Sequence, residues 1–284
     1  MYLRPFDPWK NELCSCPPKY SLNPYTGCEH GCLYCYASSY IKDFFNCRLK
    51  LNLIEKLKKE IEKVPTNSLI SLSNTSDPYP PKEKFLRITR KCLEIFKKHE
   101  IRILVITKSN IVCRDIDILK EMPSSVTITV TTLRYDKVLE PFAPSSLVRL
   151  KALESLSKRG IPTGLRLDPL IPLLNEREAE KILRLAKSAG VSHVTASTFK
   201  PRWDSWRRIE NSFSHIAKKI RPLYFEEGIK KFNAWYLSET RRKELISELR
   251  EICDSLSLSF SSCREGFLEL NSAPSCDGSH LCIR

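Results

Sequence analysis

The sequence predicts an α/β fold with parallel strands, and three observations support this prediction. Short apolar runs alternate with longer amphipathic stretches between residues 48 and 222. The run at 126–131 alternates strictly between apolar residues and threonine, which is the pattern of a half-buried strand. Leu147, Leu150 and Leu153 recur at the spacing of one helix face. Strands that alternate with helices in this way imply parallel strands joined by helical crossovers.

The expected elements follow one another in a regular order. With a first strand before Cys28 they make about six βα units, too few for a closed barrel of eight. The later elements are helix 48–64, strand 68–73, helix 82–99, strand 101–107, a short helix at 115–121, strand 126–131, helix 147–156, strand 163–168, helix 179–186 and strand 192–197.

Three parts are expected along the chain. The alternation stops near residue 222, and a helix at 239–256 then precedes a tail rich in Ser, Cys, Gly and Pro. The expected parts are an N-terminal segment with Cys14 and Cys16 (1–20), an α/β body (21–222) and a helical, Cys-rich C-terminal extension (223–284).

Composition limits the class of protein. The chain has 284 residues, of which 42% are hydrophobic and 8 are glycine, as in an ordinary packed globular protein. No apolar run approaches the roughly 20 residues of a membrane span, and the first residues lack the apolar core of a signal peptide. We therefore expect a cytoplasmic protein without membrane contact, where clustered cysteines more often bind metal than form disulfides. The absence of glutamine beside abundant Lys, Arg and Glu favours a thermophilic source.

The formal net charge is +14, and one stretch, 200–221, is both basic and aromatic. There Arg207 and Arg208 stand beside Trp203 and Trp206. Basic residues interleaved with aromatic ones suit a phosphate backbone with stacked bases. The alternative is a solvated helix face without a ligand. The pattern makes nucleic acid a candidate partner.

Polar residues gather where the expected strands end. In parallel α/β barrels the C-terminal ends of the strands carry the active site, but such residues also begin loops and cap helices. This second interpretation is strong for Asp77 and Asp168, because each precedes a proline. It is weaker for Lys108, which can anchor a carboxylate. The gathered residues are Ser73–Asp77, Thr107–Ser109, Thr131, Thr132, Asp168 and Ser197.

Three of the 12 cysteines, Cys28, Cys32 and Cys35, stand in one short loop with C-x3-C-x2-C spacing. Three thiolates at this spacing can converge on a single metal centre. A [4Fe–4S] cluster normally takes four Cys ligands, so three leave one iron open to a group that is not protein. An open iron usually marks a cluster that takes part in chemistry, and an enzyme is therefore predicted.

A cysteine loop of this kind after a first strand and before βα units resembles the radical S-adenosylmethionine (radical SAM) superfamily. The likeness, over about residues 15–200, is to the branch related to spore photoproduct lyase, a DNA repair enzyme, and lies in Asn23–Ala37, Thr75–Tyr79, Thr107–Ser109, Arg114–Asp117 and Leu139–Pro141. The resemblance implies a partial (β/α)6 barrel of TIM type and a [4Fe–4S] cluster that binds SAM. It also implies a 5′-deoxyadenosyl radical that abstracts hydrogen from a substrate, and an electron donor such as ferredoxin or flavodoxin.

The resemblance assigns cofactor-binding roles to single residues. Cys28, Cys32 and Cys35 would ligate the cluster. Ser76 and Lys108 would contact the methionine part of SAM, with Lys108 at its carboxylate.

Four further residues are implied by position. Thr129 and Arg149 are SAM-binding candidates on the fourth strand and its helix. Tyr34 and Tyr36 match a tyrosine pair that shields the cluster or relays hydrogen, and they are the catalytic candidates. The Gly-Gly-Glu motif common in the superfamily is absent, and residues 75–77 take its place.

One position departs from the family pattern. Spore photoproduct lyase has a cysteine immediately before its Thr-Ser-Asp stretch, and this cysteine donates a hydrogen atom to the product radical. Here that position is Asn74. An amide N–H bond is far stronger than an S–H bond, so we expect no repair of the spore photoproduct by the thiol-donor mechanism. Cys47 and Cys113 are alternative thiol donors, although each fits a small buried residue.

The tail cysteines predict a second metal site. Cysteines in a Gly-, Ser- and Pro-containing loop without a packing stripe are poor candidates for core filling. We expect an auxiliary [4Fe–4S] cluster or a structural zinc, or alternatively free thiols or a disulfide. His280 is a further candidate ligand, and the expected ligands are Cys263, Cys276 and Cys282 with Cys14 or Cys16.

Three functional hypotheses remain open. The first is a radical SAM enzyme of lyase or transferase type that acts on a nucleic acid. The second is a radical SAM enzyme that modifies a peptide, protein or small metabolite with help from an auxiliary cluster. The third is a non-catalytic metal protein that binds nucleic acid, and formation of 5′-deoxyadenosine distinguishes it from the other two.

Overall fold

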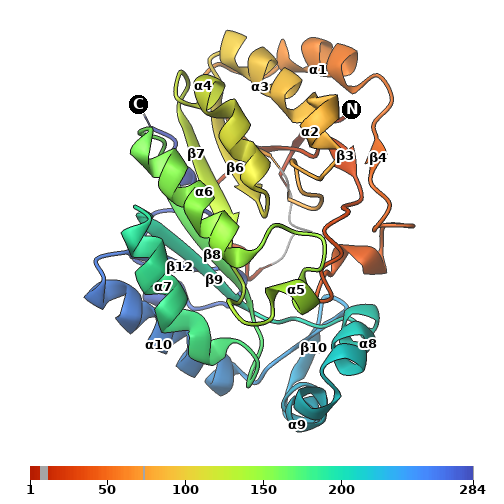
Figure 1. Ribbon diagram of the computed structural model, residues 1–284, viewed down its shortest axis with the longest axis vertical. Coiled ribbons are helices and arrows are strands. Elements are labelled where there is room, and N and C mark those ends of the chain that lie inside the picture. The colour runs from red at the N-terminus through yellow and green to blue at the C-terminus, as the bar shows by residue number, and fades with distance from the viewer. Residues whose placement is uncertain (7–11, 73, 284) are drawn as a thin grey trace.

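The computed structural model describes residues 1–6, 12–72 and 74–283, and its centre is one eight-stranded sheet (Figure 1). Six parallel strands follow chain order, a seventh parallel strand (β12) pairs with β9, and β1 lies antiparallel to β2 at the other edge. The strands in sheet order are β1 (Arg4–Pro5), β2 (Tyr20–Leu22), β5 (Leu69–Leu72), β6 (Arg102–Thr107), β7 (Ser124–Thr129), β8 (Thr163–Leu170), β9 (His193–Thr198) and β12 (Ser259–Ser262). Among the described residues the two edge strands do not pair with each other, so the expected partial barrel is confirmed.

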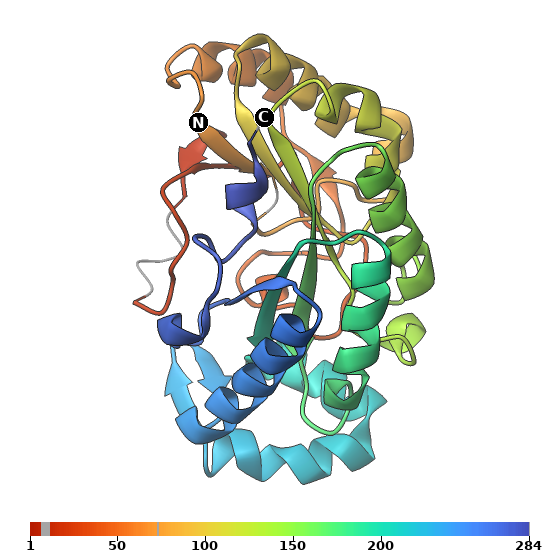
Figure 2. The same ribbon diagram turned by 90° about the vertical axis from the view of Figure 1, so that its left-hand side faces the viewer.

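Helices cover one side of this sheet, as the green helices in Figure 2 show. The longer helices are α1 (Leu53–Ile61), α3 (Ile88–Lys98), α6 (Ser146–Lys158), α7 (Ala179–Ser188), α8 (Trp203–Ser212), α9 (Ser214–Phe225) and α10 (Glu239–Ser255). The short elements are α2 (Glu83–Leu86), α4 (Ile116–Leu119), α5 (Asp136–Leu139), the hairpins β3–β4 (Tyr25–Thr26, Arg48–Leu49) and β10–β11 (Ile229–Lys231, Ala234–Tyr236), and five 3-10 turns, η1 (Ala37–Ser39), η2 (Asn110–Asp115), η3 (Glu176–Glu178), η4 (Leu268–Leu270) and η5 (Ser279–Leu281).

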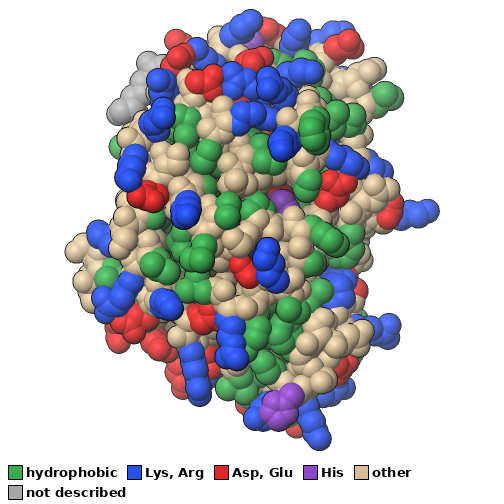
Figure 3. Space-filling view, viewed as in Figure 1, with side chains coloured by type: hydrophobic (Ala, Val, Ile, Leu, Met, Phe, Trp, Pro, Cys, Tyr) green, Lys and Arg blue, Asp and Glu red, His purple; other side chains and the backbone are tan. Residues whose placement is uncertain are grey.

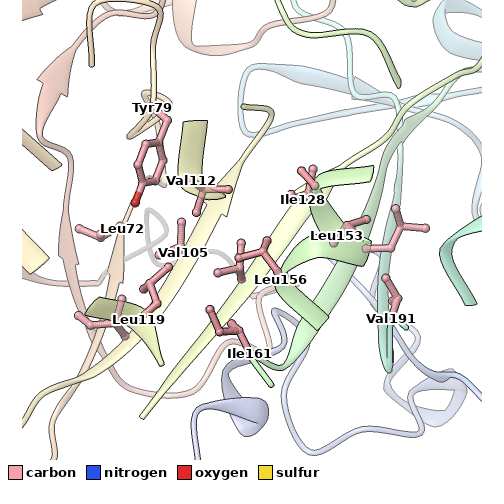
Figure 4. Packing of buried hydrophobic residues seen from close by; sticks show 14 of the residues in the cluster. Leu72, Tyr79, Val105, Val112, Leu119, Ile128, Leu153, Leu156, Ile161 and Val191 are labelled. Atoms are coloured by element: carbon pink, nitrogen blue, oxygen red, sulfur yellow. The ribbon is translucent and has the colours of Figure 1, made fainter. Parts of the chain in front are cut away.

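The core lies between the sheet and these helices (Figure 4). Ile128 of β7 and Leu153 and Leu156 of α6 are fully buried in one apolar cluster with Val105 of β6. Each such side chain contributes about 1.5–3 kcal/mol when it leaves water. The apolar half of the alternating strand pattern therefore forms the core.

The other face of the strands is polar, and the C-terminal tail covers it. Thr195 Oγ1 of β9 donates to the carbonyl of Cys276 at 2.7 Å, and Ser125 Oγ of β7 donates to that of Gly278 at 3.3 Å. Gly278 has φ 83°, and a Cβ there would lie 3.2 Å from Thr127 Oγ1, so this close approach favours glycine. In Figure 2 the blue tail accordingly runs on the side opposite the green helices.

The expected helix 82–99 is divided in two. Arg87 adopts a left-handed conformation with φ 53°, so α2 ends before it and α3 begins after it. The carboxylate of Glu83 accepts the backbone N–H of Thr89 at 3.0 Å and caps the new helix. Glu83 lies six residues before Thr89 in the sequence. The capping residue that usually directly precedes a helix is therefore missing, and the start of α3 could not be predicted.

The other expected elements form near their predicted bounds, and the main sheet gains two strands. Helix 48–64 begins only at Leu53, and strand 68–73 ends at Leu72, since residue 73 lies outside the described residues. The stretch 200–221 forms α8 and most of α9. Strands β1 and β12 were not expected, and β12 joins part of the region 223–284 to the main sheet. Among the described residues there is no helix with the length and apolarity to cross a membrane.

Candidate active site

A cavity of about 710 Å³ lies at the C-terminal ends of the strands and extends along the N-terminal segment. The loops after β5, β6, β9 and β12 contribute to its lining, as do the C-terminal parts of β7 and β8 and the cysteine loop. Of the described polar residues expected at the strand ends, most line this cavity, whereas Ser76, Ser109, Thr131 and Thr132 do not. The lining includes Cys28, Cys32, Cys35, Tyr34, Tyr36, Asn74, Asp77, Lys108, Thr129 and Asp168.

The cysteine loop (28–35) is tied to the body by backbone hydrogen bonds. The N–H of Cys28 donates to the carbonyl of Phe44 at 2.7 Å, and the N–H of Leu33 donates to that of Leu139 at 2.9 Å. The second bond connects the loop to α5, at the start of the Leu-Glu-Pro stretch. The loop is thus held on both sides by short elements at the rim of the barrel.

Helix α8 also braces the loop. Arg208 donates from Nε to the carbonyl of Leu33 and from Nη2 to that of Cys35, both at 2.8 Å. Ser38 Oγ donates to the carboxylate of Asp204 at 2.6 Å. Arg208 Nη1 donates to the same carboxylate at 3.2 Å. This half-buried basic residue of the stretch 200–221 therefore faces the cysteine loop.

The other basic residues of that stretch are distributed differently. Arg207, Lys218, Lys219 and Arg221 are exposed, whereas Arg202 lines the cavity. On the face shown in Figure 3, Lys and Arg side chains are scattered among acidic and apolar ones and do not form one continuous stripe.

The three loop thiols suit a metal cluster. Cys28 and Cys32 are buried, Cys35 is partly buried, and all three line the same cavity. Burial raises the pKa of the Cys32 thiol to about 12, opposed by Lys108. A buried thiol of this kind stays protonated unless a metal takes the place of the proton, so three soft donors facing one cavity fit an iron–sulfur cluster.

Asp77 ties the cysteine loop to two strand ends. Its carboxylate accepts from Thr107 Oγ1 at 2.6 Å and from the backbone N–H of Lys108 at 2.7 Å, and it lies 3.3 Å from Nε2 of His30. Burial acts to raise the pKa of Asp77, but His30 and these donors outweigh it and hold the pKa below its ordinary value. Asp77 therefore positions the site as a fixed anion.

A second buried carboxylate, Glu140, was not predicted as a site residue. Arg149 pairs with it, Tyr34 donates to it, and Thr131 Oγ1 donates at 2.8 Å. Lys108 Nζ lies 4.0 Å away. Burial opposes ionisation, yet Arg149 and Lys108 lower the pKa of Glu140 to about 2. The only sequence signal for Glu140 was its place in the Leu139–Pro141 stretch.

The SAM-binding candidates fall into two groups. Lys108 and Thr129 line the cavity. Ser76 is buried, and its backbone N–H donates to Asn23 Oδ1 at 3.2 Å. Arg149 is fully buried, donates to the carbonyl of Thr129 at 2.8 Å and does not line the cavity. Arg149 was expected to contact SAM directly. In this arrangement it lies outside the cavity wall and positions Glu140 and Thr129.

Tyr36 and Asn74 adjoin each other in the cavity wall. The hydroxyl of Tyr36 donates to the backbone carbonyl of Asn74 at 2.9 Å. The Asn74 amide donates to Ser21 Oγ at 2.6 Å. Cys47 and Cys113 do not line the cavity, so neither of these thiols stands in for the side chain at position 74.

The remaining cysteines do not group as expected. Cys16 and Cys276 have their sulfurs 3.3 Å apart, and Cys14 is hydrogen-bonded to Cys16. The hydrogen bonds with Cys14 and Cys276 lower the pKa of the Cys16 thiol below its ordinary value. Cys282 lies elsewhere, fully buried beneath the tail, where it meets Ser125 Oγ at 3.0 Å. The route of the tail over the sheet therefore separates Cys282 from the other cysteines.

The family model of the Radical SAM superfamily matches residues 22–186, more than half of the chain. The chain belongs to the radical SAM superfamily. The resemblance to this superfamily, inferred from the cysteine loop and the motifs that follow it, is thus confirmed.

Solved radical SAM structures share the fold. Spore photoproduct lyase in complex with dinucleoside spore photoproduct superposes with a TM-score of 0.68 over 86% of this chain and 75% of that chain, at 18% identity. Streptococcus suis SuiB bound to S-adenosylmethionine gives a TM-score of 0.58 over 89% of this chain and 53% of that chain, at 9% identity. At these identities the likeness concerns the fold alone.

Relatives by sequence are uncharacterized proteins. One from Methanocaldococcus jannaschii is 35% identical over 167 residues, 56% of this chain and 63% of that protein. One from Acidianus two-tailed virus is 27% identical over 232 residues, 74% of this chain and 76% of that protein. The match to the first relative thus spans less than two thirds of its length.

Membership in the radical SAM superfamily supports an enzyme that uses a [4Fe–4S] cluster, SAM and a reductant. The three cavity-facing thiols of the cysteine loop fit that cluster. Membership does not specify the substrate or the reaction outcome, and these belong to the proposal below.

Proposed function

We propose that this radical SAM enzyme acts on a nucleic acid strand held in the cavity. The observation that carries the proposal is the charge of the cavity wall. Among the described residues that line it, Lys and Arg outnumber Asp by eight to three. Four of these cations, Arg166, Lys200, Arg202 and Arg264, come from β8 and from the segments that follow β9 and β12.

The cations are held in position by neighbouring groups. Arg166 Nη2 lies 2.7 Å from the carboxylate of Asp168, and Lys200 pairs with the buried Glu265. Arg264 donates to the hydroxyl of Tyr236 at 3.0 Å. Guanidinium groups fixed in this way suit phosphate oxygens, which they bind in bidentate fashion.

Beside these cations lies the part of the cavity for cofactors. Cys28, Cys32 and Cys35 would hold the cluster, which supplies reductive cleavage of SAM to a 5′-deoxyadenosyl radical that removes hydrogen from the substrate. Lys108 would bind the SAM carboxylate, and Thr129 would contact SAM from the end of β7. Ser76, Arg149 and Glu140 would hold this wall in place, and Tyr34 and Tyr36 would exclude water and shield the cluster.

The reaction proposed is distinct from thiol-dependent repair. Asn74 lines the cavity where spore photoproduct lyase has its donor cysteine, and its amide is already bound to Ser21. The solved structure of spore photoproduct lyase holds a dinucleoside, which supports a nucleic acid ligand in this fold but not the same chemistry. The enzyme class therefore stays open between lyase and transferase.

A second candidate function is modification of a peptide, a protein or a small metabolite. The observation that favours it is a group of cysteines that lines the cavity beside the cysteine loop (28–35). This group consists of Cys14, Cys16 and Cys263. SuiB, which shares the fold, has been solved bound to its precursor peptide. A non-catalytic metal protein that binds nucleic acid is the third candidate.

The test begins with the anaerobically reconstituted protein, reduced in the presence of SAM. Formation of 5′-deoxyadenosine is measured with and without single-stranded DNA or RNA. We expect 5′-deoxyadenosine in both cases and a change in the nucleic acid only in the second. If no 5′-deoxyadenosine forms, the non-catalytic function replaces the one proposed here.

Binding of the same strands is measured over a range of salt concentrations. The expected logarithmic slope is about −0.7 for each phosphate neutralised on a single strand. Replacing Arg264 by alanine should weaken binding and make the slope shallower, whereas replacing the exposed Arg207 of α8 should leave both unchanged. Absence of binding, or binding without salt dependence, excludes nucleic acid and favours the peptide or metabolite function.

A further inference from the structure

Four cysteines from both ends of the chain meet beside the cavity. Cys14 and Cys16 belong to the N-terminal segment, Cys263 directly follows β12, and Cys276 lies in the tail. The Cys16 and Cys276 sulfurs are 3.3 Å apart, and Cys14 is hydrogen-bonded to Cys16. We call these four residues the second cysteine group.

The unexpected strand β12 explains how Cys263 reaches this place. Ser262 pairs with Ala196 of β9, and the N–H of Cys263 donates to the carbonyl of Ala196 at 2.8 Å. Cys263 therefore stands at the same rim as the other strand ends. Together with Cys14 and Cys16 it lines the cavity that also contains the cluster loop.

Cations flank the second cysteine group on two sides. Lys19 pairs with Asp277, next to Cys276, and lies close enough to Cys16 to act on its charge. The Arg166 side chain is hydrogen-bonded to Cys263. Positive groups at these positions offset the negative charge of thiolate ligands, and charge and hydrogen bonds near cluster sulfurs are known to set the reduction potential.

We propose that Cys14, Cys16, Cys263 and Cys276 ligate a second [4Fe–4S] cluster. Four soft thiolates select zinc or an iron–sulfur centre. Among the described residues no group of three His, Cys, Asp or Glu side chains is arranged to hold a single metal ion, and this includes the loop Cys28–Cys35. A cluster binds each thiolate through a different iron, so its ligands need not surround one ion. The arrangement thus gives no support to a mononuclear zinc site among the described residues.

A disulfide between Cys16 and Cys276 is the competing use of these residues. The 3.3 Å separation of their sulfurs is longer than the roughly 2.05 Å of a disulfide bond. A disulfide would also leave Cys14 and Cys263 without a role, although both face the cavity. A cluster uses all four.

Four protein ligands leave no iron open to SAM or substrate. The second cluster therefore accepts or supplies single electrons, and the substrate does not bind to it directly. This inference does not depend on whether the substrate is a nucleic acid.

The test uses the full chain with Cys28, Cys32 and Cys35 replaced by alanine, which removes the first cluster and all SAM cleavage. Iron, sulfide and zinc are measured after anaerobic reconstitution, and the reduced sample is examined by electron paramagnetic resonance. We expect about four iron and four sulfide per chain, the content of one cluster. Adding SAM should leave the resonance signal unchanged.

Further substitution in this background identifies the ligands. Cys16→Ser with Cys276→Ser should remove the iron and the signal, and so should Cys14→Ser with Cys263→Ser. Cys282→Ser is the matched control in the same tail and should keep both. Circular dichroism of each variant separates loss of the cluster from loss of the fold.

Four results would overturn the inference: zinc in place of iron, no metal at all, a Cys16–Cys276 disulfide shown by mass spectrometry, or iron that survives the double substitution of Cys14 and Cys263. The last result would make Cys14 and Cys263 free thiols facing the cavity. Because the first cluster is absent throughout, failure here leaves the proposed enzymatic function untouched.

Discussion

Arg208 Nη2 donates to the carbonyl oxygen of Cys35 at 2.8 Å, across 173 residues of sequence. The same guanidinium reaches the carbonyl of Leu33, so one side chain holds two points of the cysteine loop. Helix α8, whose basic and aromatic residues suggest nucleic acid binding, thus also stabilises the cysteine loop.

Replacing Arg208 by alanine should loosen the cluster loop. A hydrogen bond from a charged group contributes about 1.5–3 kcal/mol, so the first cluster should lose iron to a chelator about tenfold faster or more. Iron release from the reconstituted protein measures this. The neighbouring Arg207 is exposed on the same helix, and Arg207→Ala should release iron at the wild-type rate. Equal rates for the two variants would contradict a bracing role for Arg208.

Replacing Lys108 by methionine should weaken SAM binding. The side chain lines the cavity, and loss of a charge-assisted contact to the carboxylate should raise the Kd about tenfold or more. Isothermal titration of the reconstituted protein gives this value. Lys120 is exposed and lies outside the cavity, so Lys120→Met serves as the control. An unchanged Kd for Lys108→Met would remove Lys108 from the SAM site.

Replacing Arg149 by methionine should chiefly affect stability. The change leaves the buried Glu140 without its closest cation, at a cost of about 3–5 kcal/mol in the free energy of unfolding. Replacing Glu140 by leucine in the same chain should recover much of this loss, as measured by denaturant unfolding. If the double variant were as unstable as Arg149→Met, a pairing role for Arg149 would be untenable.

The strands and the cysteine loop could be predicted because local patterns specify them. Strict alternation at 126–131 predicted both the strand and the face that packs against α6. The spacing of Cys28, Cys32 and Cys35 predicted the cysteine loop. The short run Ser259–Ser262 has only one apolar residue, Phe260, so nothing in it predicts β12. Tertiary pairing with β9 makes it a strand.

The grouping of the other cysteines could not be predicted for a similar reason. Spacing along the chain does not show which way a tail crosses a sheet. Cys282 is three residues beyond Ser279, yet the tail buries it against Ile103, whose carbonyl it meets at 3.2 Å. Cys14 and Cys16 both join the group because the N-terminal segment runs beside the tail, where Lys19 pairs with Asp277.

The pKa of Glu140 leads to a prediction on acid stability. Arg149 and Lys108 overcome burial and lower this pKa to about 2, whereas an unfolded chain gives about 4.3. A carboxylate with a depressed folded pKa stabilises the fold above its unfolded pKa, and this contribution is lost as the pH falls towards the folded value. The window is therefore about pH 4.5 down to pH 2.

The measurement compares wild type with Glu140→Gln, which cannot titrate at this position. Each pKa unit is worth about 1.4 kcal/mol, so the difference in unfolding free energy should shrink by about 3 kcal/mol between pH 5 and pH 2. Above pH 5 the difference should be constant, since Glu140 is then ionised in both the folded and the unfolded state. Glu154→Gln is the control, because Glu154 lies on the surface of α6 in an exposed pair with Lys158. A difference that stays constant down to pH 2 would show that Glu140 is not held as an anion by Arg149 and Lys108.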